Sequence, residues 1–287
     1  MNVKNSVRFA ALALAGALAA LPVFSQSQAS TGQITGRVVD AQGGVVPGAS
    51  VTVSNPATGF SRSVATNDDG LYTIPLLPPG TYEVVGQLTG FQTVKRPAVV
   101  VTVGSSVTVD LRLGVAGVAE AVTVEGAAAL VETTSDTRST TLDSTAIANL
   151  PINGRRFQDF VSLTPTAQVD TSRGQISLAG QRGINTNISV DGADYNQPFF
   201  GGIRGGERSN FAFTIPQESI QEFQVVASGY TAEFGRSSGG LVNAITKSGT
   251  NQFKGSAFFV DRDKGLASKN VFNQDAAPTQ KQFGGSF

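Results

Sequence analysis

The stretch TIPQESIQEFQVVASGYTAEFGRSSGGLVNAITKSGTNQFKG (Thr214–Gly255) decides the fold. It contains two short apolar runs, Ile220–Val226 and Leu241–Thr246, which a glycine-rich segment separates. Short apolar runs bounded by turn residues are typical of buried β-strands. Glycine supplies the dihedral freedom that the connection needs. We therefore expect two strands joined by a glycine-rich turn.

This succession resembles the closing segment of the plug domain in TonB-dependent outer-membrane receptors. The residues that carry the resemblance are Ile220, Glu222, Phe223, Val225, Phe234, Gly235, Gly239, Gly240, Val242, Asn243, Ile245, Thr246 and Lys247. The resemblance implies export and docking segments before the plug and a β-barrel after it.

The composition narrows the function classes. The chain has 287 residues with 21 basic and 21 acidic side chains, so it lacks the basic surface that nucleic-acid binding needs. It has no Cys and no His, which rules out disulfides, thiol chemistry and a Ser-His-Asp triad. We expect no cofactor, no metal and no enzymatic activity.

The N-terminus has the layout of a secretory signal. Lys4 and Arg8 precede the apolar run Phe9–Leu21, which is too short for a transmembrane helix. Small residues before Ser30 predict cleavage after Ala29, with Ser25 as the alternative. We therefore expect residues 1–29 to be removed on export.

Residues 31–113 predict a β-sandwich. Turn residues separate seven short runs. Within the last run, alternation puts Val107, Val109, Leu111 and Leu113 on one face. The runs are Gln33–Asp40, Ser50–Asn55, Arg62–Thr66, Tyr72–Ile74, Thr81–Leu88, Gln92–Arg96 and Ser106–Leu113.

The same segment resembles the carboxypeptidase regulatory-like domain, a transthyretin-type sandwich. The resemblance rests on ITGRV (Ile34–Val38), PGA (Pro47–Ala49), TNDDGLY (Thr66–Tyr72) and LLPPGTY (Leu76–Tyr82). Asn67–Gly70 lacks the ligand pattern of a calcium loop, so we interpret it as a hairpin turn.

Residues 114–140 read as a linker with an extended, alternating segment, Ala119–Gly126. A free extended segment of this kind can add as a strand to another sheet. The receptor resemblance places a TonB box here, carried by Glu120, Val122, Val124 and Glu125. The alternative is a last strand of the sandwich.

Residues 141–250 predict a mixed α+β plug. Asp143–Asn149 fits a short capped helix, and Phe157, Phe160, Val161 and Leu163 fit a second helix that ends before Pro165. The run Leu150–Pro165 resembles the plug opening of the Oar-like branch of the receptors.

Two further plug motifs follow as predicted strands, Ile176–Arg182 and Asn187–Gly192. They resemble the Gly-x-Arg and Val-Asp-Gly motifs of the receptors, here Gly180, Arg182, Val190, Asp191 and Gly192. Asp191 and Asp194 have the spacing of a carboxylate pair. No accompanying nucleophile or cofactor motif supports catalysis, so Asp191-Gly192 predicts a hairpin turn.

The segment Tyr195–Phe213 is rich in glycine and aromatic residues. Its aromatic side chains either contact an extracellular ligand or wedge the plug against the barrel wall, and both interpretations remain open. They are Tyr195, Phe199, Phe200, Phe211 and Phe213.

Residues 251–287 predict the start of a barrel. Gln252–Val260 is long enough for one tilted transmembrane strand, and Gln282–Phe287 begins another. A plugged transporter barrel needs about 22 strands. We therefore expect this chain to be the N-terminal part of a longer protein.

Together, these features predict part of a TonB-dependent outer-membrane receptor. It would gate energy-coupled uptake or export of an unidentified ligand, and its sandwich and TonB-box segment would lie on the periplasmic side. The expected partner is the periplasmic C-terminal domain of TonB, with Gly235, Gly239 and Gly240 as a hinge. The alternative is a secreted or surface module that uses the sandwich to bind carbohydrate or protein.

Overall fold

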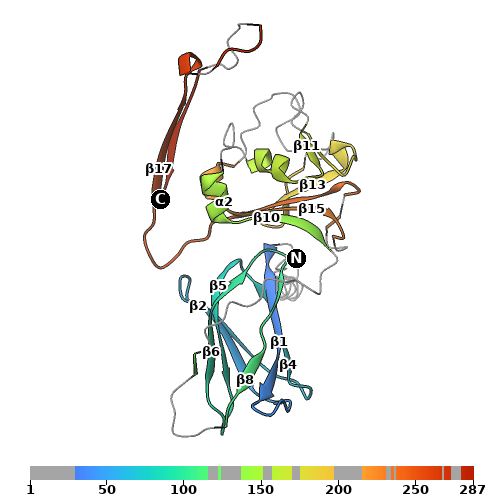
Figure 1. Cartoon of the computed structure of the whole chain (residues 1–287), viewed down its shortest axis with the longest axis vertical. Coiled ribbons are helices and arrows are strands. Elements are labelled where there is room, and N and C mark those ends of the chain that lie inside the picture. The colour runs from blue at the N-terminus through green and yellow to red at the C-terminus, as the bar shows by residue number, and fades with distance from the viewer. Residues whose placement is uncertain are drawn as a thin grey trace, which may run out of the picture.

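The computed structural model describes residues 30–115, 122–123, 137–150, 157–169, 175–196, 215–230, 234–235, 237–266, 268–272 and 279–287. Within these ranges the fold is mainly β, as predicted. Figure 1 shows three parts in succession: a two-sheet sandwich, a sheet with short helices beside it, and a long hairpin.

The sandwich contains the first nine strands. One sheet has the order β4-β1-β7, with β8 also paired to β1, and the other has the order β3-β2-β5-β6-β9. Pairing is antiparallel except that β7 and β8 run parallel to β1 and β9 runs parallel to β6. The strands are β1 (Gly32–Asp40), β2 (Ser50–Asn55), β3 (Phe60–Ala65), β4 (Leu71–Leu77), β5 (Gly80–Gln87), β6 (Val94–Val101), β7 (Ser106–Thr108), β8 (Leu111–Leu113) and β9 (Val122–Thr123).

The core between the two sheets follows the predicted alternation. Val109, Leu111 and Leu113 are buried, and Val107 packs against the same cluster. Each fully buried aliphatic side chain contributes about 1.5–3 kcal/mol. The Tyr72 hydroxyl donates to the carbonyl of Val109 at 2.6 Å, so the hydroxyl group is hydrogen-bonded inside the core.

Three sandwich strands differ clearly from the prediction. Strand β4 continues past the expected end at Ile74 to Leu77, through Pro75. The run Ser106–Leu113 divides into β7 and β8, because the Asp110 carboxylate, rather than a backbone carbonyl, accepts from the Arg37 N–H at 2.9 Å. Strand β6 continues past the expected end at Arg96 to Val101, through Pro97.

The second part is a five-stranded mixed sheet with the order β10-β15-β16-β13-β14. Strand β10 begins at Arg138, inside the expected linker, so the sheet starts before residue 141. A separate pair, β11 and β12, lies beside it. The strands are β10 (Arg138–Leu142), β11 (Ala167–Val169), β12 (Ile176–Leu178), β13 (Thr186–Val190), β14 (Ala193–Asp194), β15 (Ile220–Ser228) and β16 (Gly240–Thr246).

Short helices pack against one face of this sheet. Helix α2 (Ser144–Asn149) begins as predicted, with the Asp143 carboxylate accepting from the Ala146 N–H at 2.7 Å. The expected second helix is a 3₁₀-helix, η2 (Phe157–Leu163). Within it Phe160 and Val161 reach the core, whereas Leu163, expected on the same apolar face, is exposed. The other 3₁₀ turns are η3 (Gly183–Asn185) and η4 (Gln217–Ser219).

Strand β15 buries both of its faces. A bulge between Ile220 and Glu222 shifts the alternation, so that Ile220 and Phe223 both belong to the core under the helices. Glu222 and Gln224 are buried on the opposite face. In Figure 1 the end of the sandwich lies below this sheet.

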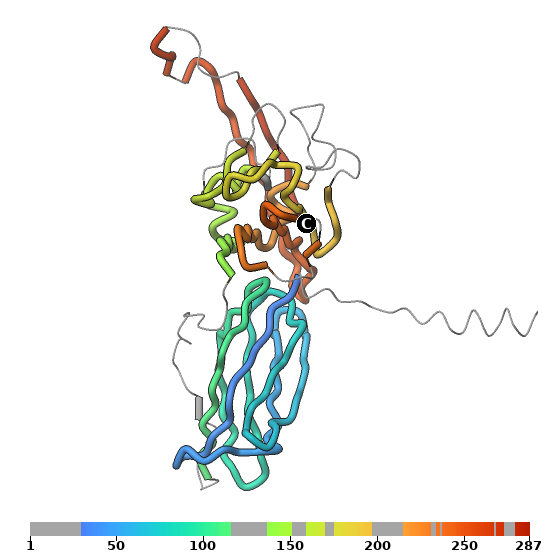
Figure 2. The backbone as a smooth tube through the Cα atoms, turned by 90° about the vertical axis from the view of Figure 1, so that its right-hand side faces the viewer, coloured from blue at the N-terminus to red at the C-terminus, as the bar shows by residue number. Residues whose placement is uncertain are grey.

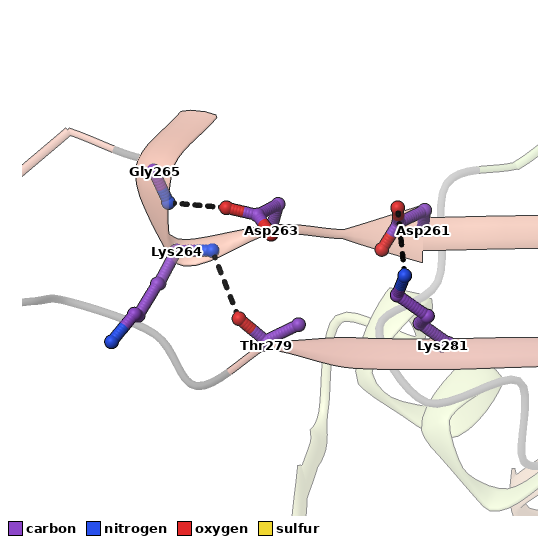
Figure 3. Close-up of polar contacts among 6 residues, drawn as sticks. All are labelled: Asp261, Asp263, Lys264, Gly265, Thr279 and Lys281. Atoms are coloured by element: carbon purple, nitrogen blue, oxygen red, sulfur yellow. Dashed lines mark hydrogen bonds and ion pairs between the residues drawn. The ribbon is translucent and has the colours of Figure 1, made fainter.

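The third part is the hairpin β17 (Ser256–Arg262) and β18 (Gln280–Ser286). Figure 2 shows it running beside the second part and projecting beyond it, away from the sandwich. At its far end, Lys281 pairs with Asp261 at 3.8 Å, and the Lys264 N–H donates to Thr279 Oγ1 at 3.4 Å beside the turn η5 (Lys264–Leu266) (Figure 3).

Within the described ranges, no helix has the length and apolar character needed to cross a membrane.

Candidate functional site

The predicted plug motifs of β13 and β16 meet at the turn after β13. Asp191 and Gly192 both have positive φ, 51° and 78°, and together form the two-residue turn of the β13–β14 hairpin. The Asp191 carboxylate accepts from the Thr246 N–H at 2.8 Å and from the Thr246 hydroxyl at 2.7 Å. The Val-Asp-Gly and Ile-Thr-Lys motifs therefore secure each other.

The pair Asp191 and Asp194 has a structural arrangement. Asp194 Oδ1 accepts from the backbone N–H of Asn196 at 2.9 Å and from its side-chain amide at 2.7 Å. Asp191 is hydrogen-bonded to Thr246, so the carboxylates of Asp191 and Asp194 both stabilise the turn through local hydrogen bonds. This arrangement matches the predicted hairpin.

Gly240 is required where β16 begins. Its φ is 122°, and a Cβ there would lie 2.6 Å from Leu178 Cδ1 and 2.7 Å from the Val226 carbonyl oxygen. Gly180 also has a positive φ of 78°, yet nothing surrounds its Cβ direction. Gly240 therefore serves close packing, while Gly180 serves only the turn before η3.

The glycine run before β16 is anchored at one end. The N–H groups of Ser238 and Gly239 both donate to the Asn185 carbonyl at 3.1 Å, and Gly239 is buried. Ser237 Oγ accepts from the Gly240 N–H at 2.9 Å. Gly235, by contrast, is exposed with open space in its Cβ direction, and its carbonyl accepts from the Asn187 side-chain amide at 2.8 Å. The hinge remains a prediction, and Gly235 has the most space around it of the three glycines.

A row of polar side chains crosses the sheet on the face turned away from the helices. Gln224 pairs in register with Asn243, and Asn243 pairs with Ser189. Ser189 Oγ donates to Asn243 Oδ1 at 2.8 Å, and Asn243 is fully buried. The motif residue Asn243 on β16 is therefore hydrogen-bonded to Ser189 on the neighbouring strand β13.

Glu222 joins this sheet to the sandwich. Its Oε1 accepts from the Val103 N–H at 3.0 Å, and Gln224 Nε2 donates to the Val103 carbonyl at 3.0 Å. Burial raises the pKa of the Glu222 carboxyl from 4.5 to about 7; the Val103 hydrogen bond opposes this shift and the negative charge of Asp143 adds to it. The sequence motif marked Glu222, but nothing in the motif pointed to Val103.

The TonB-box-like segment is only partly described. Val122 lies in β9, whose backbone pairs in parallel with β6 through Val94↔Val122 and Lys95↔Thr123. Glu120, Val124 and Glu125 lie outside the described residues. This pairing fits the alternative of a last sandwich strand and also places Val122 and Thr123 at the edge of a sheet.

The remaining predicted residues are spread over the second part. Tyr195 is half-buried and packs against the core under the helices, whereas Phe199, Phe200, Phe211 and Phe213 lie outside the described residues. Arg182 and Lys247 are exposed, and Phe234 is half-buried. In the part of the chain that the structure covers, no cluster of three or more acidic side chains could hold a metal ion.

The fold and these contacts define a β-sandwich that docks on a mixed sheet, and this sheet carries the residues predicted to be plug motifs. Residues 33–114 match the carboxypeptidase regulatory-like domain. Over 254 residues the chain is 31% identical to the TonB-dependent transporter Oar of Myxococcus xanthus, an alignment that covers 85% of this chain and 22% of the relative. The predicted resemblance to Oar-like TonB-dependent receptors is thus confirmed.

Two solved receptor structures align with part of the chain. The outer membrane transporter YddB from Escherichia coli is 15% identical, with a TM-score of 0.38 over 46% of this chain and 20% of that one. The siderophore receptor PirA from Pseudomonas aeruginosa is 25% identical, with a TM-score of 0.31 over 43% of this chain and 21% of that one.

Proposed function

We propose that this chain supplies the sandwich, the plug and the first barrel strands of a TonB-dependent outer-membrane transporter. The observation that carries the proposal is the 31% identity to Oar over 254 residues. An alignment of that length extends well beyond the sandwich match at residues 33–114. It therefore favours a transporter over a sandwich that merely binds carbohydrate or protein.

The proposed mechanism is mechanical. The segment Ala119–Gly126 is released into the periplasm for part of the time, and ligand binding at the outer face shifts the plug and increases that fraction. The segment then adds as a strand to a sheet of the C-terminal domain of TonB. Main-chain hydrogen bonds between the two strands supply the affinity. Val122 and Thr123, the two described residues of this segment, have extended backbone paired with β6.

The hairpin β17–β18 supports a barrel in the same proposal. Phe259 and Phe283 are cross-strand partners and are 67% and 79% exposed, so this face of the hairpin covers nothing within the described residues. Gln282 and Gly284 lie on the opposite face of β18. Phe258 and Val260 share that opposite face, and the Asp261–Lys281 pair lies on the Phe259 face, so the support for a barrel is the exposure of Phe259 and Phe283 themselves, which suits a strand pair that meets lipid.

A binding assay tests the coupling step without knowledge of the ligand. Full-length protein in detergent is titrated with the purified C-terminal domain of TonB. Deleting Ala119–Gly126 should abolish binding, while an equal-length deletion over residues 127–134 should preserve it. If both deletions bind as the wild type does, the segment is not the TonB box. If the first deletion instead lowers the stability of the sandwich and leaves binding unchanged, the segment is its last strand.

A further inference from the structure

The five-stranded sheet β10-β15-β16-β13-β14 is named the plug sheet after the predicted plug motifs that it carries. The sandwich meets the plug sheet through the turn Thr102–Ser105, between β6 and β7. Ser105 Oγ accepts from the Thr102 N–H at 3.0 Å and donates to the Thr102 carbonyl at 2.7 Å. Gly104 has a φ of 68°, and its N–H donates to the Thr31 carbonyl at 3.0 Å. These bonds make a firm turn with Val103 at its tip.

Both backbone polar groups of Val103 bond to side chains of one strand in the plug sheet. The N–H meets Glu222 and the carbonyl meets Gln224, both at 3.0 Å, and these two side chains are neighbours on one face of β15. Val103, Glu222 and Gln224 are 1%, 3% and 7% exposed. A Cβ on Gly104 would lie 3.1 Å from Gln224 Nε2, so the fit is close.

The surroundings of Glu222 favour the neutral acid. On β16 its register partner is Ile245, and the sandwich presents the uncharged backbone of Val103. From the start of α2, the carboxylate of Asp143 adds a like charge. A buried carboxylate beside another negative charge is costly, and a single backbone N–H offsets this cost only in part.

We propose that Glu222 and Gln224 form a latch that docks the sandwich on the plug sheet, and that the latch loosens when Glu222 loses its proton. The side chain would prefer water once it is charged, and water is reached by undocking. The latch acts within this chain, so it goes beyond the proposed transport function and depends neither on a ligand nor on TonB.

The direction of the pH effect follows from linkage. The pKa of Glu222 is about 7 in the docked state, and the ordinary value of 4.5 applies once the side chain is exposed. Docking is therefore strongest below about 4.5, weakens by up to tenfold per pH unit as the pH rises, and levels off above about 7.

Hydrogen–deuterium exchange of the full-length protein in detergent tests the latch directly, because the Val103 amide is itself the donor. Protection of peptides covering residues 102–105 is measured from pH 5 to pH 8.5 and corrected for intrinsic exchange rates. We expect wild-type protection to fall at least tenfold between pH 5 and 7.5 and then to level off. Glu222→Gln should remove this dependence.

The matched control is Glu83→Gln on β5. Glu83 is partly exposed and pairs with Lys95 at 3.8 Å, so its substitution should leave the wild-type profile in place. Protection that is constant over the pH range in the wild type, or an unchanged slope in Glu222→Gln, would overturn the proposal. Should Glu222→Gln fail to fold, Gln224→Ala decides: it must lower protection at every pH, and wild-type protection in this variant refutes the latch.

Discussion

Glu222 in the plug sheet accepts a hydrogen bond from the backbone N–H of Val103 in the sandwich, with 3.0 Å between nitrogen and oxygen. The two residues are 119 positions apart in the chain. The contact buries a motif carboxylate between two parts of the molecule that each have their own hydrophobic core. Movement of the sandwich and the charge of the plug sheet are consequently linked.

This link predicts a pH-dependent stability that Glu222→Gln removes. Because burial raises the pKa of Glu222 to about 7, its stabilising contribution is complete below 4.5 and is lost as the pH rises toward 7. Relative to wild type, the variant should gain up to about 3 kcal/mol in unfolding free energy between pH 5 and pH 8. Denaturant unfolding of both proteins at the two pH values measures this gain, and a constant difference would contradict it.

The packing at Gly240 predicts a large loss for Gly240→Ala. The substitution combines a strained φ of 122° with contacts of 2.6 and 2.7 Å to Leu178 and Val226. Strain and overpacking together should cost roughly 2–5 kcal/mol. Gly235→Ala is the control, since nothing lies near its Cβ direction, and it should change stability by less than about 0.5 kcal/mol. Thermal unfolding compares the two variants, and equal effects would refute the packing argument.

The bonds between Asp191 and Thr246 predict a coupling between two plug motifs. Asp191→Asn keeps a residue that tolerates positive φ but loses one acceptor oxygen, and Thr246→Val removes the hydroxyl donor at similar volume. Each single variant should cost about 1 kcal/mol. In a double-mutant cycle we expect a coupling energy of about 0.5–1.5 kcal/mol, whereas additive effects would mean that the side-chain bond contributes nothing.

The sequence predicted most of the sandwich because its strands obey local rules. Period-2 alternation and turn residues place Val109, Leu111 and Leu113 correctly. The division of β7 from β8 was missed because it depends on Asp110, which bonds to a residue 73 positions away. The extension of β6 was missed because Pro97 reads as a strand breaker, yet the strand continues beyond it.

In the predicted plug, the sequence motifs marked Asp191, Gly192 and Glu222, but they predicted the structural role of only the first two. Asp191-Gly192 follows from turn chemistry, so the hairpin was predictable. The burial of Glu222 was not, because β15 is covered on both faces and its bulge removes any simple alternation. The contact between Glu222 and Val103 depends on how the sandwich docks on the plug sheet, and no local sequence pattern predicts it.

The exposed aromatic pair Phe259 and Phe283 predicts which side of β18 meets lipid, since Phe258 on the other face is half-buried. Phe283 shares its face with Phe259, while the neighbouring Gln282 points to the other face. An Arg on the lipid face of a barrel costs about 2–4 kcal/mol at the membrane midplane, whereas lumen positions tolerate charge.

Phe283→Arg should therefore lower the amount of full-length protein in the outer membrane and reduce the fraction that migrates as a folded, heat-modifiable band. Gln282→Arg introduces the same charge one residue away and should leave both quantities close to wild type. The comparison separates the face of the strand from the charge itself. If Gln282→Arg is the more damaging of the two, the exposed Phe259 and Phe283 face the lumen or another protein surface, and the proposed orientation of the hairpin is reversed.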